Sequence, residues 1–158
     1  YQACAVLQTK QDFYDMTMAY MRRSHKDNLA HAEIFVDPQS HTSRGVPLEV
    51  VLDGMTEALR DSHEDMGMTH GIIVSILRHL DADSAMELIE STLAYRKENP
   101  DSPIIGIGLD SSELGHPPSK FVEAFAKARE HGLKVCAHAG EEGPASYIVE
   151  ALDLLNVD

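Results

Sequence analysis

The segment Gly71–Leu77, which reads Gly-Ile-Ile-Val-Ser-Ile-Leu, is almost entirely apolar. A strand that is apolar on both faces must be covered on both sides, as the strands of parallel sheets are. Three further apolar runs predict strands at Ala32–Val36, Pro103–Leu109 and Leu133–Ala137. Helical patterns lie between these runs. Alternating strands and helices favour a parallel sheet with right-handed crossovers.

Apolar residues at helical spacing, together with capping residues, predict the intervening helices. The first should run from about Thr9 to Asp27, with Thr9 and Asp12 as a capping box. The buried face of this helix should contain Phe13, Met16 and Tyr20. The later helices should begin near Pro47, Asp81 or Asp83, Pro117–Pro118 and Pro144, with Ile148, Ala151, Leu152 and Leu155 inward on the last.

The predicted order is therefore one helix followed by four βα units in a single domain over residues 1–158. Two α/β architectures fit this order: an open doubly wound sheet, or part of a TIM (β/α)8 barrel. A complete barrel takes about 250 residues, so 158 residues can form about half of one.

Composition excludes several classes of protein. Asp and Glu outnumber Lys and Arg by 26 to 13, and a net charge of −13 disfavours binding to nucleic acid. No apolar run approaches the roughly 18 residues of a membrane helix, and no leader pattern opens the sequence, so we expect no membrane association and no secretion. Cys4 and Cys136 lie far apart and are expected to be reduced thiols in a cytoplasmic protein.

Polar residues stand within two positions of the end of each predicted strand. They are Asp37, His79, Asp110 and His138. The carboxyl ends of parallel strands meet at one edge, where the chemistry of parallel α/β folds gathers. We therefore expect Asp37, Asp110, His138 and Glu141 at one end of a sheet with strand order 1-2-3-4.

His138 is the strongest candidate for a metal ligand, because an imidazole at the end of a buried strand is held rigidly. Glu141 follows in a turn bounded by glycines. A carboxylate beside a metal-activated water can move a proton during hydrolysis. Glu142 is interpreted as a negative charge at the N-terminus of the next helix, and Glu141 fits either role.

Three segments together resemble the adenosine/adenine deaminase family. They are Phe35-Val-Asp-Pro-Gln39 with His41-Thr42 and Arg44-Gly45, Gly108-Leu-Asp-Ser-Ser-Glu113 with Gly115-His-Pro-Pro-Ser-Lys-Phe121, and His138-Ala-Gly-Glu-Glu-Gly-Pro144. The resemblance spans the whole chain in order. The Leu-Asp-Ser-Ser-Glu version is more similar to the bacterial and fungal adenine deaminase branch than to the classical adenosine deaminases.

The resemblance implies a metal-dependent, amidohydrolase-type (β/α)8 barrel that uses one Zn²⁺ to deaminate a 6-aminopurine and release ammonia. By resemblance, His138 is a zinc ligand and Glu141 is the catalytic acid/base that protonates N1 of the purine. The substrate-binding residues implied by the same match are Asp37, Gly108, Asp110, Ser112 and Glu113. Glu113 stands where a small residue would leave more room, so adenine should be preferred over adenosine. An adenine substituted on its amino group remains a third option.

The family's zinc site also uses a His-x-His on the first strand, an Asp on the last and a His in a later Asp-His-Gly segment. None of these motifs occurs in this sequence. We expect the chain to correspond to the second to fifth βα units, to be inactive by itself and to self-associate through exposed sheet edges. The alternatives are a non-catalytic α/β binding module, or another metal-dependent amidohydrolase of the same superfamily.

Overall fold

The computed structural model describes residues 2–158, which divide into two compact units. The first contains the residues up to Ile34, Pro38–Ile72 and Asp101–Pro103. The second contains Phe35–Asp37, Ile73–Pro100 and Ile104–Asp158. Candidate site residues from the sequence all lie in the second unit.

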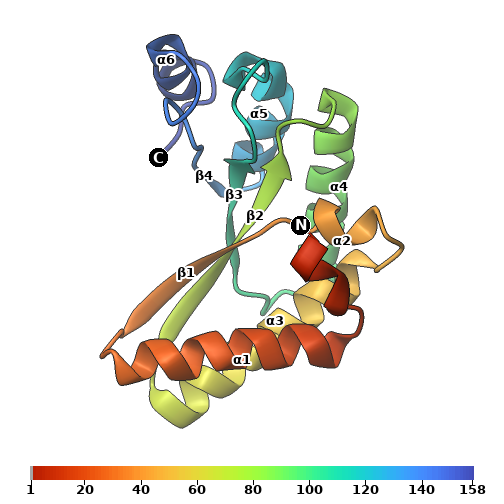
Figure 1. Ribbon diagram of the computed structural model, residues 1–158, viewed down its shortest axis with the longest axis vertical. Coiled ribbons are helices and arrows are strands. Elements are labelled where there is room, and N and C mark those ends of the chain that lie inside the picture. The colour runs from red at the N-terminus through yellow and green to blue at the C-terminus, as the bar shows by residue number, and fades with distance from the viewer. Residues whose placement is uncertain (1) are drawn as a thin grey trace. The chain divides into compact units, whose positions relative to one another are not determined.

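Two long helices, α1 (Lys10–Lys26) and α3 (Leu48–Met66), pack along each other in the first unit (Figure 1). The predicted capping box at Thr9 and Asp12 begins α1. Gly54 of α3 allows the close approach, because a Cβ there would lie 2.4 Å from the carbonyl oxygen of Lys10. Two short helices that the sequence patterns do not predict complete the unit: η1 (Gln2–Val6) and α2 (Gln39–Thr42).

The buried face of α1 differs from the predicted one. Phe13 is fully buried, but Met16 and Tyr20 are 43% and 47% exposed. Met18 and Met21 are buried instead. Apolar residues at helical spacing occur on two faces of this helix, so spacing alone could not select the one that packs on α3.

The four strands form one sheet in the order β1-β2-β3-β4, as predicted. They are β1 (His31–Val36), β2 (Thr69–Leu77), β3 (Ile104–Asp110) and β4 (Lys134–Val135). The strands are parallel, and Gly106 of β3 pairs with Lys134 of β4. Strand β4 is shorter than predicted, but Cys136 and His138 continue its direction by donating backbone hydrogen bonds to Ile107 and Leu109.

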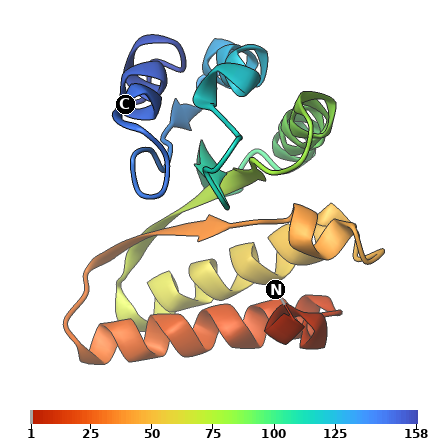
Figure 2. The same cartoon turned by 45° about the horizontal axis from the view of Figure 1, so that its top comes forward.

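Three helices of the second unit stand in a row in both views (Figures 1 and 2). They are α4 (Ala82–Glu98), α5 (Val122–Glu130), which follows the short η2 (Pro118–Phe121), and α6 (Ala145–Asp153). Asp81 caps α4 by accepting a hydrogen bond from the Ser84 amide. No helix within residues 2–158 has both the length and the apolar character needed to cross a membrane.

Helix α6 corrects one prediction. Ala151 and Leu155 are buried as expected, whereas Ile148 and Leu152 are 43% and 55% exposed. Helix α6 stands at the end of the row (Figure 2), and the described residues leave part of its apolar face exposed. The apolar face inferred from the sequence is therefore wider than the face that is buried.

Candidate active site

The carboxyl ends of the strands bring Asp37, Asp110 and His138 together in the second unit. Asp37 follows β1, Asp110 ends β3 and His138 follows β4. Nδ1 of His138 lies 2.6 Å from Oδ1 of Asp110, and Asp37 lies close enough to Asp110 for the two carboxyl groups to influence each other's charge. The predicted meeting of strand ends is thus present for these three side chains.

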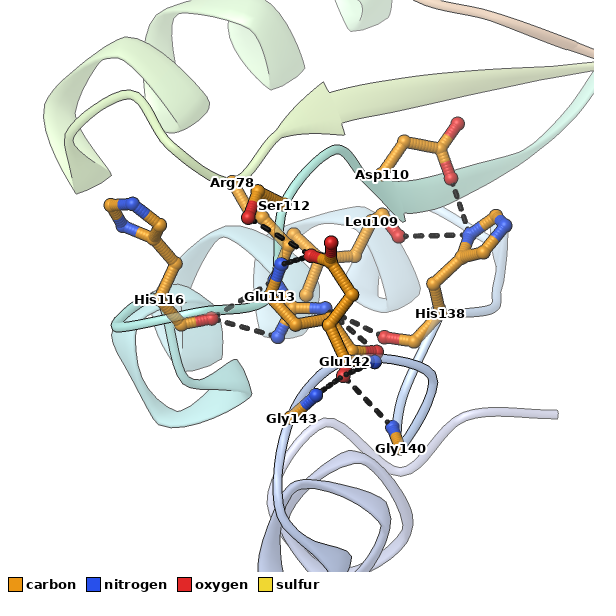
Figure 3. Close-up of polar contacts among 10 residues, drawn as sticks. All are labelled: Arg78, Leu109, Asp110, Ser112, Glu113, His116, His138, Gly140, Glu142 and Gly143. Carbon is orange, nitrogen blue, oxygen red and sulfur yellow. Dashed lines mark hydrogen bonds and ion pairs between the residues drawn. The ribbon is translucent and has the colours of Figure 1, made fainter.

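The ring of His138 is held from several sides. Nδ1 also lies 3.3 Å from the Leu109 carbonyl oxygen, and Phe35 packs edge-to-face with a centroid distance of 6.2 Å. Figure 3 shows Asp110 and Leu109 both reaching the same ring nitrogen. With Nδ1 occupied, Nε2 is the atom available to bind a metal, and an imidazole oriented by a carboxylate is typical of metal-ligating histidines. The side chain is 48% exposed.

Asp37 has a strongly perturbed carboxyl group. Burial raises its pKa to about 6, with further contributions from the Asp110 charge and the Asp110 hydrogen bond, while His138 acts in the opposite direction. A buried carboxyl group beside a second carboxylate is harder to ionise, which is why the pKa of Asp37 lies above its ordinary value.

Glu141 lies in the loop between His138 and α6 and is exposed. Gly140 just before it has a φ of +82°, and a Cβ there would lie 2.6 Å from Cδ1 of Ile148. Glycine is therefore strongly favoured at this turn, since other residues rarely adopt that conformation and a Cβ would force the Ile148 side chain to move. The conformation of this loop therefore sets the direction in which the Glu141 side chain extends from the backbone.

The loop after β3 contains the other predicted substrate residues. Gly108 is buried in β3, where a Cβ would lie 2.5 Å from Oγ of Ser75. Ser112 donates a hydrogen bond of 2.9 Å to Glu142. Glu113 is only 1% exposed, and its Oε2 accepts hydrogen bonds from the backbone amides of loop 140–143. The Glu113 carboxylate thus faces protein, not open space.

Two residues in this region have roles that the sequence patterns do not assign. Arg78, directly after β2, is fully buried and ties together the loops after β3 and β4. One signal in the sequence could have identified Arg78: a lone arginine directly follows a continuous apolar strand.

Glu142 is expected from its position to act as a charge at the helix N-terminus, but its carboxylate instead accepts hydrogen bonds from Ser112 and the Glu113 amide. His79 hydrogen-bonds to Ser111 at 2.7 Å.

The side chains near His138 could supply one ligand of a metal site but not a complete set. No group of three His, Cys, Asp or Glu side chains in residues 2–158 could hold a metal ion. His138 fits a single zinc ligand, while catalytic zinc takes three protein ligands. A zinc ion at this rim therefore needs ligands from beyond the side chains described here.

Comparison with solved structures shows which class of proteins has this fold. The structure of an adenine deaminase from Arthrobacter aurescens superposes with a TM-score of 0.92 at 53% identity, covering 98% of this chain and 46% of the other. A zinc-bound amidohydrolase from Burkholderia ambifaria superposes at 0.89 with 31% identity, covering 96% and 41%. The fold is that of a partial (β/α)8 barrel of the amidohydrolase and deaminase class.

The sequence comparisons define the family. The adenosine deaminase family pattern matches residues 1–158, and the chain belongs to that family. It is 51% identical to the adenine deaminase of Ralstonia pickettii over 158 residues, which is 100% of this chain and 46% of that protein. It is 53% identical to the adenine deaminase of Zymomonas mobilis over 158 residues, with shares of 100% and 45%. The chain spans about half the length of the curated relatives it matches.

Proposed function

We propose that this chain supplies the central βα units of an enzyme that hydrolyses the 6-amino group of a purine, with adenine preferred. The observation that carries the proposal is the orientation of His138, whose Nδ1 is bound by Asp110 and whose Nε2 is left for a metal. The identity of about 51% to adenine deaminases over the whole chain supports the same reaction. Residues 1–158 would then belong to a single barrel domain.

His138 would provide one ligand to Zn²⁺, and Asp110 would orient it. Zinc held there would supply a water molecule of lowered pKa and polarise it for attack. The remaining ligands would come from outside the residues described. Asp110 has a further task, because its contact with Nδ1 fixes the ring so that Nε2 keeps one direction.

Glu141 would move the proton. In the reaction, the oxygen of water bonds to C6 of the purine, the bond from C6 to its amino nitrogen breaks, and ammonia leaves. Glu141 gives a proton to ring nitrogen N1, which makes C6 electrophilic, and recovers a proton from the water. The second water proton accompanies the amino group, so adenine plus water gives hypoxanthine plus ammonia.

The rim around His138 would bind the purine. Asp37 and Asp110 would present their carboxyl groups to the purine, while Ser112 adds a hydroxyl on the loop after β3. Gly108 lets β3 lie close to Ser75, because a Cβ on Gly108 would lie 2.5 Å from Oγ of Ser75. The preference for free adenine over the larger nucleoside is proposed from the identity of about 51% to adenine deaminases, and Glu113, whose carboxylate is buried against loop 140–143, would support the wall from behind. A cytoplasmic setting would suit an enzyme that acts on a purine metabolite.

The test is ammonia release by the full-length protein with zinc, measured for adenine, adenosine and N6-methyladenine. We expect the highest kcat/KM with adenine. A clear preference for adenosine would overturn the substrate assignment but keep the reaction. Absence of ammonia release from all three, by a protein that binds stoichiometric zinc, would overturn the reaction itself and favour a non-catalytic binding role.

A further inference from the structure

A buried ion pair connects the strand ends of the second unit. The side chains of Arg78 and Glu113 are 0% and 1% exposed, and Nη1 of Arg78 lies 3.6 Å from Oε1 of Glu113. Buried charges are costly unless both partners are fully hydrogen-bonded, so their remaining contacts show what the pair holds in place. The aromatic ring of Tyr147, from α6, covers the guanidinium at 5.7 Å.

Arg78 binds backbone from two loops. Its Nε and Nη2 donate to the carbonyl oxygen of His116 at 2.9 and 2.7 Å, and its Nη1 donates to the carbonyl oxygen of His138 at 2.7 Å. The Arg78 amide donates to the Asp110 carbonyl at 3.0 Å. One arginine after β2 therefore fixes the exits of both β3 and β4 (Figure 3).

Glu113 binds the loop that contains Glu141. Its Oε2 accepts hydrogen bonds from the amides of Gly140, Glu142 and Gly143 at 3.1, 3.3 and 2.6 Å. Burial alone would raise the pKa of Glu113, but these amides and Arg78 outweigh it and hold the pKa below its ordinary value. Glu113 is thus an ionised acceptor at neutral pH.

The loop after β3 and the loop that contains Glu141 bind each other in both directions and pack closely. The Glu142 carboxylate accepts hydrogen bonds from the Ser112 hydroxyl at 2.9 Å and the Glu113 amide at 3.1 Å. A Cβ on Gly143 would lie 2.6 Å from Oε2 of Glu113 and 2.5 Å from the Tyr147 ring. The hydrogen bonds from the amides of Gly140, Glu142 and Gly143 to Glu113 therefore tie the backbone of loop 139–143 to a buried side chain.

We propose that Arg78 and Glu113 are positioning residues, and that their pair sets the place of Glu141 by holding the residues on either side of it. The inference rests on the proposed function, since it assigns the proton to Glu141. It departs from a purine-contacting role for Glu113, whose carboxylate is committed to the loop amides. The backbone at Glu141 is clamped while its side chain stays exposed, as a proton carrier facing substrate requires.

The experiment combines hydrogen–deuterium exchange with kinetics on the full-length protein. Glu113→Ala removes the acceptor, Glu113→Gln keeps one acceptor oxygen, and Glu123→Ala removes an exposed carboxylate of α5 as the matched control. We expect amides 140–143 to exchange at least about tenfold faster in Glu113→Ala than in wild type, and less so in Glu113→Gln. We expect kcat for adenine to fall about tenfold or more, with KM and zinc content nearly unchanged and Glu123→Ala like wild type.

Glu142→Ala covers the case in which Glu113→Ala does not fold, because Glu142 is exposed and its loss leaves no buried charge unpaired. It should loosen the same amides and lower kcat to a smaller extent. Unchanged exchange of amides 140–143 in every folded variant would overturn the proposal, and so would faster exchange with unchanged kcat. A wild-type protein that releases no ammonia would instead overturn the proposed function, while the exchange data would still report whether Glu113 holds the loop.

Discussion

Nδ1 of His138 lies 2.6 Å from Oδ1 of Asp110, so a carboxylate at the end of β3 fixes the imidazole that follows β4. The two residues are on neighbouring parallel strands, and the Leu109 carbonyl approaches the same nitrogen at 3.3 Å. A ring bound through Nδ1 can rotate little, and its Nε2 keeps one direction. If His138 binds a metal as proposed, this contact would hold the ring in place before the metal arrives.

Replacing Asp110 should weaken metal binding while His138 itself remains. We expect Asp110→Asn in the full-length protein to lower zinc affinity about 10- to 100-fold, because an amide no longer supports the imidazole as a charged acceptor does. Competition with a chelator measures the affinity. Asp153→Asn, an exposed change on α6, is the control, and equal affinities in both variants would show that Asp110 does not orient the ligand.

Replacing Glu141 should abolish turnover and keep the metal. Glu141→Gln has nearly the same shape but cannot transfer a proton, so we expect kcat for adenine to fall about 10²- to 10⁴-fold with full zinc occupancy. Steady-state kinetics and metal analysis on the same sample check both parts. Turnover that survives the change would remove Glu141 from the chemistry and point to another proton carrier.

His41 should make stability depend on pH. Burial lowers its pKa, and the neighbouring Arg44 lowers it further. Nδ1 of His41 accepts a hydrogen bond from Arg44 at 2.9 Å, since arginine can only donate. The folded state therefore binds fewer protons than the unfolded state as pH falls below about 6.5, and stability present above that pH is lost on acidification through the lower, folded-state pKa.

The measurement is urea unfolding between pH 5 and 8 (conditions chosen to bracket about 6.5). His41→Asn places an oxygen where Nδ1 lies, so it should keep the Arg44 hydrogen bond and flatten the slope. Burial also lowers the pKa of His70 and His116, so part of the slope should remain. An unchanged slope in His41→Asn would mean that these other histidines account for all of it.

Gly54 should not tolerate alanine. Alanine gains about 1 kcal/mol of helix propensity, but its Cβ would lie 2.4 Å from the Lys10 carbonyl and 2.7 Å from Cβ of Phe13. Overpacking of this kind costs about 1–3 kcal/mol, and backbone cannot move aside as a flexible side chain can. We expect Gly54→Ala to lower the free energy of unfolding by about 1–2 kcal/mol, whereas Ser91→Ala on the exposed face of α4 raises it slightly.

The sequence predicted element order, strand order and the meeting of Asp37, Asp110 and His138, because apolar runs and strand ends are local features. It did not predict α2 or the true buried face of α1, since these depend on which segments pack against them. Arg78 and Glu113 were missed as a pair for the same reason. They lie far apart in sequence, and only the fold shows that both are buried and in contact.

The 158-residue chain by itself should associate and show no deaminase activity. Strands β1 and β4 are the outer strands of the sheet, so each has an edge that no described strand pairs. Helix α6 also leaves Ile148, Val149 and Leu152 between 43% and 55% exposed. Unpaired edges and apolar surface favour association. With His138 as its one oriented ligand, the chain should bind zinc weakly.

Size-exclusion chromatography with light scattering, a zinc assay and an adenine assay on the isolated chain check these three expectations. The net charge of −13 keeps molecules apart at low salt, so the experiment belongs near physiological ionic strength, where repulsion is screened beyond about 8 Å. Association should therefore increase with added salt. A monodisperse monomer that holds stoichiometric zinc and deaminates adenine would show that these residues form a complete site without the rest of a barrel.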